Sequence, residues 1–223
     1  MRATIACLLL LSIPFTTTTN AMESAPSIEL PKPVSTGDVP VEQALDKRRS
    51  VRDFSRKALA LSDVSQLLWA AQGITSRRGF RTAPSAGALY PLELYLIAGN
   101  VDGLEPGVYR YRPKSHELVP GVSDDRRKAL AAAALDQSWV RRAPAVLVIA
   151  AVYERTRKKY GQRTGRYVHI EVGGAAQNVY LQSEALDLAT VFVGAFDDQA
   201  VSEALELPHD HEPLGLMPVG HER

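Results

Sequence analysis

A short segment near residue 50 carries side chains suited to binding an oxyanion. Arg48, Arg49 and Arg52 place three guanidinium groups around the hydroxyl of Ser50 within five residues. A guanidinium fork matches phosphate oxygens bidentately, and a hydroxyl adds one short hydrogen bond. The same pattern suits the basic end of a solvated helix, because cations stabilise a helix C-terminus. The segment therefore indicates a phosphate site, with a plain helix end as the alternative.

A second segment combines small residues with a proline, at Pro84, Ser85, Ala86 and Gly87. Small side chains let a flat ligand approach the backbone closely, and the exposed N–H groups can then bind ring heteroatoms. A loop that only leads into the following strand would have the same composition. The segment is a candidate ring-binding turn, and the plain loop is its second interpretation.

Two later segments are also candidates for a binding or catalytic role. Lys159 and Tyr160 lie in residues 154–166, which carry six Lys and Arg residues against one Glu. Gly194 and Ala195 follow the apolar run that begins at Ala189. A solvated basic turn before a helix explains the first segment without any function. The residues alone leave both readings open.

Hydrophobic periodicity places these segments on an α+β fold built around one sheet. The spacing predicts helices at 41–47, 63–72, 124–135, 168–186 and 198–205. It predicts strands at 92–98, 108–112, 117–120, 145–152, 189–195 and 214–219. Residues 145–152 are almost entirely apolar, which is typical of a central strand buried on both faces.

The N-terminal part of the chain has the features of a targeting sequence. Arg2 precedes the apolar run from Ile5 to Phe15, and Thr19-Asn20-Ala21 resembles a cleavage site. We expect a signal peptide at 1–21, a Pro-rich flexible or surface-hugging arm at 22–40 and the folded domain at 41–223. The apolar run is too short for a stable membrane anchor. A retained N-terminal helix is the alternative to export into the periplasm.

Composition excludes several classes of function. The formal net charge of +1 gives no reason to expect nucleic acid as a partner. The single cysteine, Cys7, lies in the expected signal peptide, so the mature chain would have neither disulfides nor a cysteine nucleophile. His209 and His211 lie in an acidic stretch between two prolines, which favours a surface loop. We expect no metal site.

In this order, the four segments resemble the FMN-dependent nitroreductase superfamily. They are most similar to its azoline-oxidising branch, the SagB and thiazole/oxazole dehydrogenases. That likeness rests on Pro-Ser-x-Gly-x-x-Tyr-Pro-x-Glu at 84–93 and on Lys-Tyr-Gly-x-Arg at 159–163. The resemblance extends over 41–220. It implies a three-layer fold with a central mixed sheet flanked by helices, and a homodimer with FMN at the interface.

The resemblance also assigns roles to residues. Arg48, Ser50 and Arg52 would hold the FMN phosphate, with Arg49 nearby. Pro84, Ser85, Ala86 and Gly87 would line the isoalloxazine, and Gly194 and Ala195 would face its other side. Lys159 and Tyr160 would be catalytic, because a base must remove a ring proton as hydride leaves for the flavin. Lysine serves as a base only where burial or neighbouring cations lower its pKa.

The sequence departs from the general pattern of the superfamily at two positions. Ala88 stands where that pattern has Asn, and Leu92 stands where it has an aromatic residue. We therefore expect a SagB-type dehydrogenase acting on a small heterocycle or peptide. An NAD(P)H-dependent nitro or quinone reductase and a non-catalytic flavin or ligand carrier are the alternatives. No Arg-Arg pair precedes the apolar run, so either FMN is loaded after export, or the chain has no signal peptide, or the site has lost its cofactor.

Overall fold

The computed structural model describes residues 26–223. The expected signal peptide lies outside the described residues. Within residues 26–223, none of the helices has both the length and the apolar character needed to cross a membrane.

One seven-stranded sheet runs through the described chain in the order β1-β4-β3-β2-β5-β7-β6. Its strands are β1 (Ile28–Glu29), β2 (Leu92–Ala98), β3 (Gly107–Arg112), β4 (Glu117–Pro120), β5 (Ala145–Ala151), β6 (Ala189–Thr190) and β7 (Glu212–Gly220). Neighbouring strands of this sheet are all antiparallel. The α+β class is confirmed, but the sheet is antiparallel where a mixed one was expected. Short connections such as the one from β2 to β3 allow only antiparallel neighbours.

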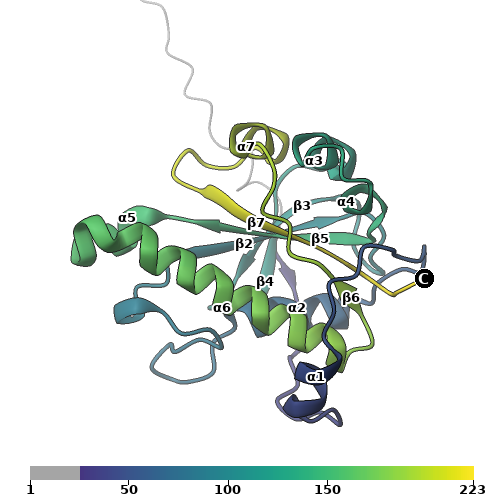
Figure 1. Ribbon diagram of the computed structural model, residues 1–223, viewed down its shortest axis with the longest axis horizontal. Coiled ribbons are helices and arrows are strands. Elements are labelled where there is room, and N and C mark those ends of the chain that lie inside the picture. Colours follow the sequence, from purple (N-terminus) through teal and green to yellow (C-terminus); the bar gives the residue numbers. More distant parts are fainter. Residues whose placement is uncertain (1–25) are drawn as a thin grey trace, which may run out of the picture.

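Helices cover both faces of the sheet and give three layers (Figure 1). They are α1 (Val41–Lys47), α2 (Leu61–Gln72), α3 (Arg127–Ala133), α4 (Ser138–Arg142), α5 (Tyr153–Tyr160), α6 (Thr164–Ala185) and α7 (Asp198–Leu205). Helices α3, α4 and α7 lie on one face, and α2 and α6 lie on the other. Successive strand side chains alternate between faces, so Leu96 packs in the core beneath α2 and α6 while Ile97 packs beneath α3 and α7.

The two central strands are buried along their whole length. All seven residues of β2 and all seven of β5 are buried. A strand covered on both faces needs a continuous apolar run, which the sequence shows for β5. In β2 the run is interrupted by Glu93, which is only 8% exposed. A buried carboxylate at this position needs polar partners.

The observed elements depart from the expected ones in three places. Helix α3 ends early because Leu135 and Asp136 adopt a positive φ of 56° each, and the separate helix α4 follows. Strand β6 has two residues instead of seven, because the Phe192 N–H donates to the Tyr180 hydroxyl rather than to β7. Helix α5 was not expected. Gly161, at φ 53°, separates it from α6.

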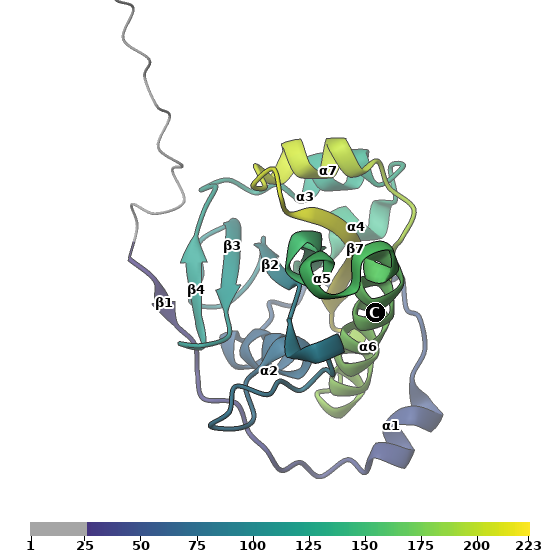
Figure 2. The ribbon, with the colours of Figure 1, turned by 90° about the vertical axis from the view of Figure 1, so that its left-hand side faces the viewer.

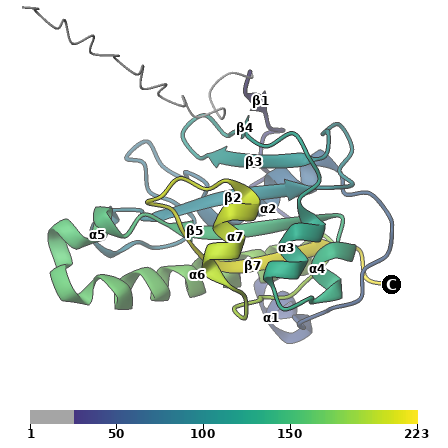
Figure 3. The same ribbon diagram turned by 90° about the horizontal axis from the view of Figure 1, so that it is seen from above.

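Helix α5 and the start of α6 extend past the end of the sheet (Figure 3). This places the C-terminal end of α5 near the turn that precedes β2. The fold thereby brings residues of the basic segment at 154–166 close to the small-residue segment at 84–87.

The described part of the arm at 26–40 packs against the domain (Figure 2). Ile28 pairs with Leu118 at the edge of the sheet, and Leu30 is only 3% exposed. His116 holds the Pro31 carbonyl at 3.0 Å. An edge strand offers unpaired backbone groups, so β1 satisfies those of β4. The surface-hugging form of the expected arm thus describes residues 28–31, and the flexible form does not.

Candidate active site

The small-residue segment forms a tight turn before β2. Gly87 has φ 62°, Ala88 has φ 53° and Tyr90 has φ 49°. The Ser85 hydroxyl oxygen accepts the Tyr90 N–H at 2.8 Å, which closes the turn on itself. Left-handed backbone is costly for residues with a side chain, so outside contacts must hold Ala88 and Tyr90.

Glu171 on α6 fixes the first half of this turn. Its carboxylate accepts the Ala86 N–H at 2.9 Å and is almost fully buried. Burial raises the pKa of Glu171, and hydrogen bonds from the Ala86 N–H and the Ser85 hydroxyl oppose the shift. The sequence placed Glu171 on the long helix but gave no sign of its partner, which lies 85 residues away.

Lys159 and Tyr160 converge on the glycine of the turn. A Cβ atom built at Gly87 would lie 2.9 Å from the Lys159 Nζ and 3.0 Å from the Tyr160 hydroxyl. The Tyr160 ring packs on Tyr167 with 4.6 Å between ring centroids. Lys159 is exposed and Tyr160 is half-buried. An amine and a hydroxyl therefore meet above a backbone that has no side chain there.

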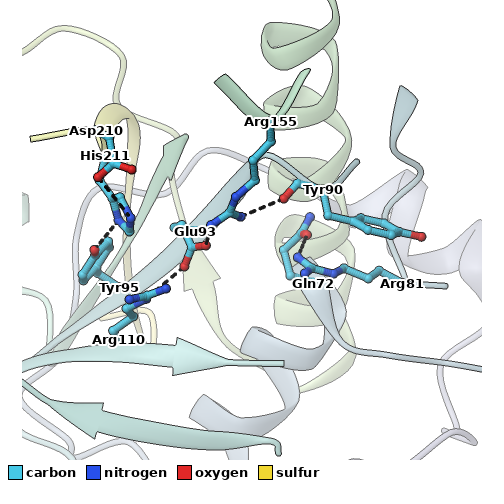
Figure 4. A network of polar contacts seen from close by, with 9 residues as sticks. All are labelled: Gln72, Arg81, Tyr90, Glu93, Tyr95, Arg110, Arg155, Asp210 and His211. Carbon is cyan, nitrogen blue, oxygen red and sulfur yellow. Dashed lines mark hydrogen bonds and ion pairs between the residues drawn. The ribbon is translucent and has the colours of Figure 1, made fainter. Parts of the chain in front are cut away.

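A charged network holds α5 against the turn (Figure 4). Glu93 lies between two arginines: its carboxylate accepts Arg110 Nε at 3.0 Å and Arg155 Nη2 at 2.5 Å. Arg155 also donates to the Tyr90 carbonyl at 3.0 Å. Arg155 lies four residues, or about one helical turn, before Lys159. The network therefore fixes the helix that carries Lys159 relative to the turn that carries Gly87.

The opposite side of the turn is braced from α2. The Arg81 guanidinium lies 4.5 Å from the centroid of the Tyr90 ring and donates to Gln72 Oε1 at 2.7 Å (Figure 4). Arg81 thus stacks on the Tyr90 ring, and its charge-assisted hydrogen bond to Gln72 fixes the guanidinium in that position. The partners of Glu93 and Tyr90 were not identified from sequence.

The arginine segment lies at the other end of α6. The Ser50 hydroxyl is 3.0 Å from the Tyr180 hydroxyl, which also accepts the Phe192 N–H at 2.7 Å. Arg48 lies over the Tyr180 ring at 5.0 Å from its centroid. Tyr180 is therefore the residue that positions the segment, and sequence reasoning missed it.

Helix α4 joins the other expected cofactor residues to this group. Arg52 lies 5.7 Å from the centroid of the Trp139 ring, and the Gln137 amide donates to the Ala195 carbonyl at 2.9 Å. Gly194 precedes Ala195, and a Cβ atom built there would lie 3.5 Å from the Phe192 ring. Arg49 differs from its neighbours, because its guanidinium donates to the backbone carbonyls of Asp46 and Arg48.

The expected site residues thus form two groups in a single chain. Glu171 contacts the group at 84–87, and Tyr180 contacts the arginine segment. Nine residues along a helix correspond to about 14 Å and to half a rotation. The two groups therefore lie toward opposite sides of α6.

The donor set of the arginine segment fits a phosphate-bearing cofactor such as FMN. In residues 26–223, neither Arg48 nor Arg52 takes part in an ion pair, so both guanidinium groups can bind an anion. The turn at 84–87 is partly exposed and has only small side chains, which suits the approach of a flat ring. These residues would hold the phosphate and the ring of FMN, respectively.

The histidines near the C-terminus are not gathered into a metal site. Among the described residues, no group of three or more His, Cys, Asp or Glu could hold a metal ion. The His211 Nδ1 is instead 2.5 Å from the hydroxyl of Tyr95 inside the domain. Burial lowers the pKa of His211, as expected for a histidine kept neutral in the core.

Comparison with known proteins gives the family. Residues 45–221 match the nitroreductase family. The Methanocaldococcus jannaschii protein MJ1384, named only provisionally as a nitroreductase, is 50% identical over 183 residues, covering 82% of this chain and 91% of its own. The microcin B17-processing protein McbC of Escherichia coli is 27% identical over 57% of this chain. The matched part covers 48% of McbC, about half the length of that protein.

A solved structure shares the fold. The E. coli microcin synthetase McbBCD complex, with a truncated pro-MccB17 bound, contains a chain that superposes with a TM-score of 0.68 at 22% identity. The match covers 97% of this chain and 85% of that one. The likeness in fold therefore agrees with the family match over 45–221. The chain belongs to the nitroreductase family.

Proposed function

We propose that this protein is an FMN-dependent oxidoreductase of the SagB dehydrogenase type, which oxidises a small heterocycle or peptide. The observation that carries the proposal is the convergence of the Lys159 amine and the Tyr160 hydroxyl on Gly87. A base and a proton relay are thereby held at the exposed turn that would line the isoalloxazine. A purely structural basic turn would not need both groups at one point.

The chain's own residues would divide the work as follows. FMN, when bound, supplies a two-electron acceptor for hydride. Lys159 takes the proton that the substrate carbon loses, and Tyr160 holds the substrate or relays that proton through its hydroxyl. The substrate loses one proton and one hydride, and a ring C–N or C–C bond becomes double. Lys159 is exposed in the single chain, so the bound ligand or a second protomer must provide its desolvation.

The substrate class follows from two considerations. The uncovered turn suits a planar ring, and the relatives include a protein named for microcin B17 processing. A peptide carrying a five-membered azoline ring combines both features. Such a ring becomes aromatic when it loses a proton and a hydride, which favours the reaction.

We further propose that the active form is a homodimer with FMN between the protomers. The two groups of site residues face opposite sides of α6 in one chain, so each protomer would contribute one group to each site. Large apolar side chains are also exposed on the relevant helices: Val41 and Leu45 on α1 and Ile170 on α6. Closed twofold symmetry would bury them and complete both sites at once.

The reaction can be tested by anaerobic mixing. FMN-loaded protein is combined with a synthetic thiazoline peptide, and the flavin absorbance is followed. Bleaching by the thiazoline peptide, with no bleaching by the matching thiazole peptide, supports the dehydrogenase. The thiazole peptide is the control, because it is the oxidised product and has no hydride to give.

A second candidate function is supported by the relative MJ1384, which is 50% identical and is provisionally named a nitroreductase. An NAD(P)H-dependent nitro or quinone reductase would bleach with NAD(P)H and reoxidise with a quinone, and would ignore the thiazoline. A non-catalytic flavin carrier would respond to neither donor. The same experiment with both donors separates the three possibilities.

We also propose that the protein is exported to the periplasm and acquires FMN there. The proposal rests on the basic, apolar and small-residue pattern at 1–21. Cell fractionation tests it, with the mature N-terminus read by mass spectrometry. Full-length protein retained in the cytoplasm would contradict it.

A further inference from the structure

A cavity of about 530 Å³ near the C-terminus is lined mainly by arginines. These residues, here called the arginine pocket, are Arg56, Arg127, Arg141, Arg142 and Arg223. They come from four separate parts of the chain: the segment after Phe54, the start of α3, the end of α4 and the chain end. Figures 1 and 3 both show the C-terminus next to the segment that follows α1, on the side of α4. Arg56, Arg127, Arg141 and Arg142 are not among the residues proposed to hold FMN, and the sequence leaves open whether Arg223 contacts the cofactor.

The backbone around the pocket is held in place. Phe54 bridges Glu222 in antiparallel fashion and is buried to 4% exposure. The Arg223 N–H donates to the Asp53 carbonyl at 3.4 Å. The segment carrying Arg56 and the segment carrying Arg223 are thereby fixed side by side.

Arg127 forms the rigid wall of the pocket. Its guanidinium makes a bidentate ion pair with Asp125, at 2.9 and 2.7 Å, and donates to the Ala143 carbonyl at 2.7 Å. It also lies directly against Gly99, where a Cβ atom would overlap it. Arg127 therefore ties α3 to the end of α4 and leaves its neighbours to face the cavity.

The other four arginines have no anionic partner in the protein. Within the described part of the chain, the guanidinium groups of Arg56, Arg141, Arg142 and Arg223 make no ion pair and no hydrogen bond. Asp53 and Glu222 are exposed nearby and are paired with none of them. Four like charges around one cavity repel one another, and an anion bound among them would relieve that repulsion.

We propose that the arginine pocket binds a small anion with two linked phosphates, such as inorganic pyrophosphate or the diphosphate of a nucleotide. A guanidinium group binds two phosphate oxygens at once, and four unpaired guanidinium groups offer more hydrogen-bond donors than a single phosphate requires. The cavity also has the volume of an ordinary small-molecule site, roughly 300–1,000 Å³. The Arg223 backbone is bonded to Asp53, and Arg52 lies over Trp139 of α4, so the pocket adjoins the FMN phosphate segment and the two sites are separated by the experiment below.

The test uses FMN-loaded full-length protein and calorimetric titration with inorganic pyrophosphate. We expect saturable binding, and an Arg141→Gln/Arg142→Gln variant should raise the Kd by about 10-fold or more. The matched control is Arg77→Gln/Arg78→Gln, which removes the same charge from an exposed pair outside the pocket. The control should keep the wild-type Kd. Titration with ADP then distinguishes a nucleotide from free pyrophosphate as the source of the diphosphate.

Four results would overturn the proposal. They are an absence of saturable pyrophosphate binding, equal weakening in both double variants, equally tight binding of citrate at matched ionic strength, and displacement of FMN by pyrophosphate. The last result would mean that the arginine pocket serves the FMN phosphate. Because binding is measured directly and without turnover, the outcome does not depend on which reaction the enzyme catalyses.

Discussion

Lys159 lies so close over Gly87 that a Cβ atom at residue 87 would be 2.9 Å from the lysine Nζ. The two residues are 72 positions apart in the chain and are brought together by the Glu93–Arg155 ion pair and by Glu171. The absence of a side chain at residue 87 is therefore what makes room for the amine. The proposed reaction depends on that space.

Gly87→Ala tests the space directly. The new methyl group meets both Lys159 and Tyr160, and the backbone at φ 62° adds strain of about 1–2 kcal/mol. We expect a loss of turnover in protein that still binds FMN. The control is Gly79→Ala, because Gly79 also has a positive φ (80°) but has nothing within 4 Å of a built Cβ. Equal turnover in the two variants would show that the Lys159–Gly87 contact has no role in the reaction.

Lys159→Ala and Tyr160→Phe test the acid–base roles. Loss of a general base or relay lowers turnover by about 10²-fold or more, while dithionite should still reduce the bound flavin. Tyr160→Phe keeps the ring that packs on Tyr167, so the fold should be unaffected. Lys158→Ala is the control for loss of charge. Wild-type turnover in both test variants would make the pair part of a solvated basic surface.

Glu93→Gln tests the network that positions α5. The carboxylate is 10% exposed and serves two guanidinium groups, each about one-third exposed. Loss of these charge-assisted bonds should lower the free energy of unfolding by about 2 kcal/mol in urea titrations. It should also reduce kcat by more than it raises KM, because Lys159 moves while the binding groups remain. Glu117→Gln is the control, since Arg112, its partner, is half exposed. A loss no greater than that of the control would contradict the positioning role.

The pH dependence of stability tests the core histidine. Burial lowers the pKa of His211 below its ordinary 6.5, so the unfolded chain binds a proton more readily than the folded one. Stability from this residue is complete above about pH 6.5 and is lost as the pH falls toward the lowered pKa. His211→Gln should flatten that decline, and exposed His209→Gln should not. An unchanged slope in His211→Gln would refute the assignment.

Apolar patterning was enough to predict the centre of the fold. Strand β2 matched its expected range of 92–98, and β5 ended within one residue of its prediction, because strands buried on both faces are rich in apolar residues. Helix α5 was missed, because its sequence is strongly polar and lacks an apolar stripe. The expected strand at 189–195 was too long, because the Phe192 N–H donates to Tyr180, a residue of a different element, and only Val193 bonds to β7 again.

Sequence reasoning named candidate site residues, but it did not find the residues that hold them in place. Small and charged side chains in a recognisable order identified the segments at 48–52, 84–87 and 159–160. The residues that position them are far away in sequence, such as Glu93 for Arg155 and Tyr180 for Ser50, 62 and 130 positions apart. Local patterns carry no information on such pairs, because the pairs form only when the sheet and α6 are assembled.

The cofactor is the most direct test of the whole account. Protein reconstituted with flavin and then denatured should release FMN rather than FAD, about one per chain. Arg48→Ala and Arg52→Ala should each weaken FMN binding by about 1.5–3 kcal/mol, or 10- to 100-fold, and exposed Lys47→Ala should leave it unchanged. Colourless protein that cannot be reconstituted with FMN would contradict the account.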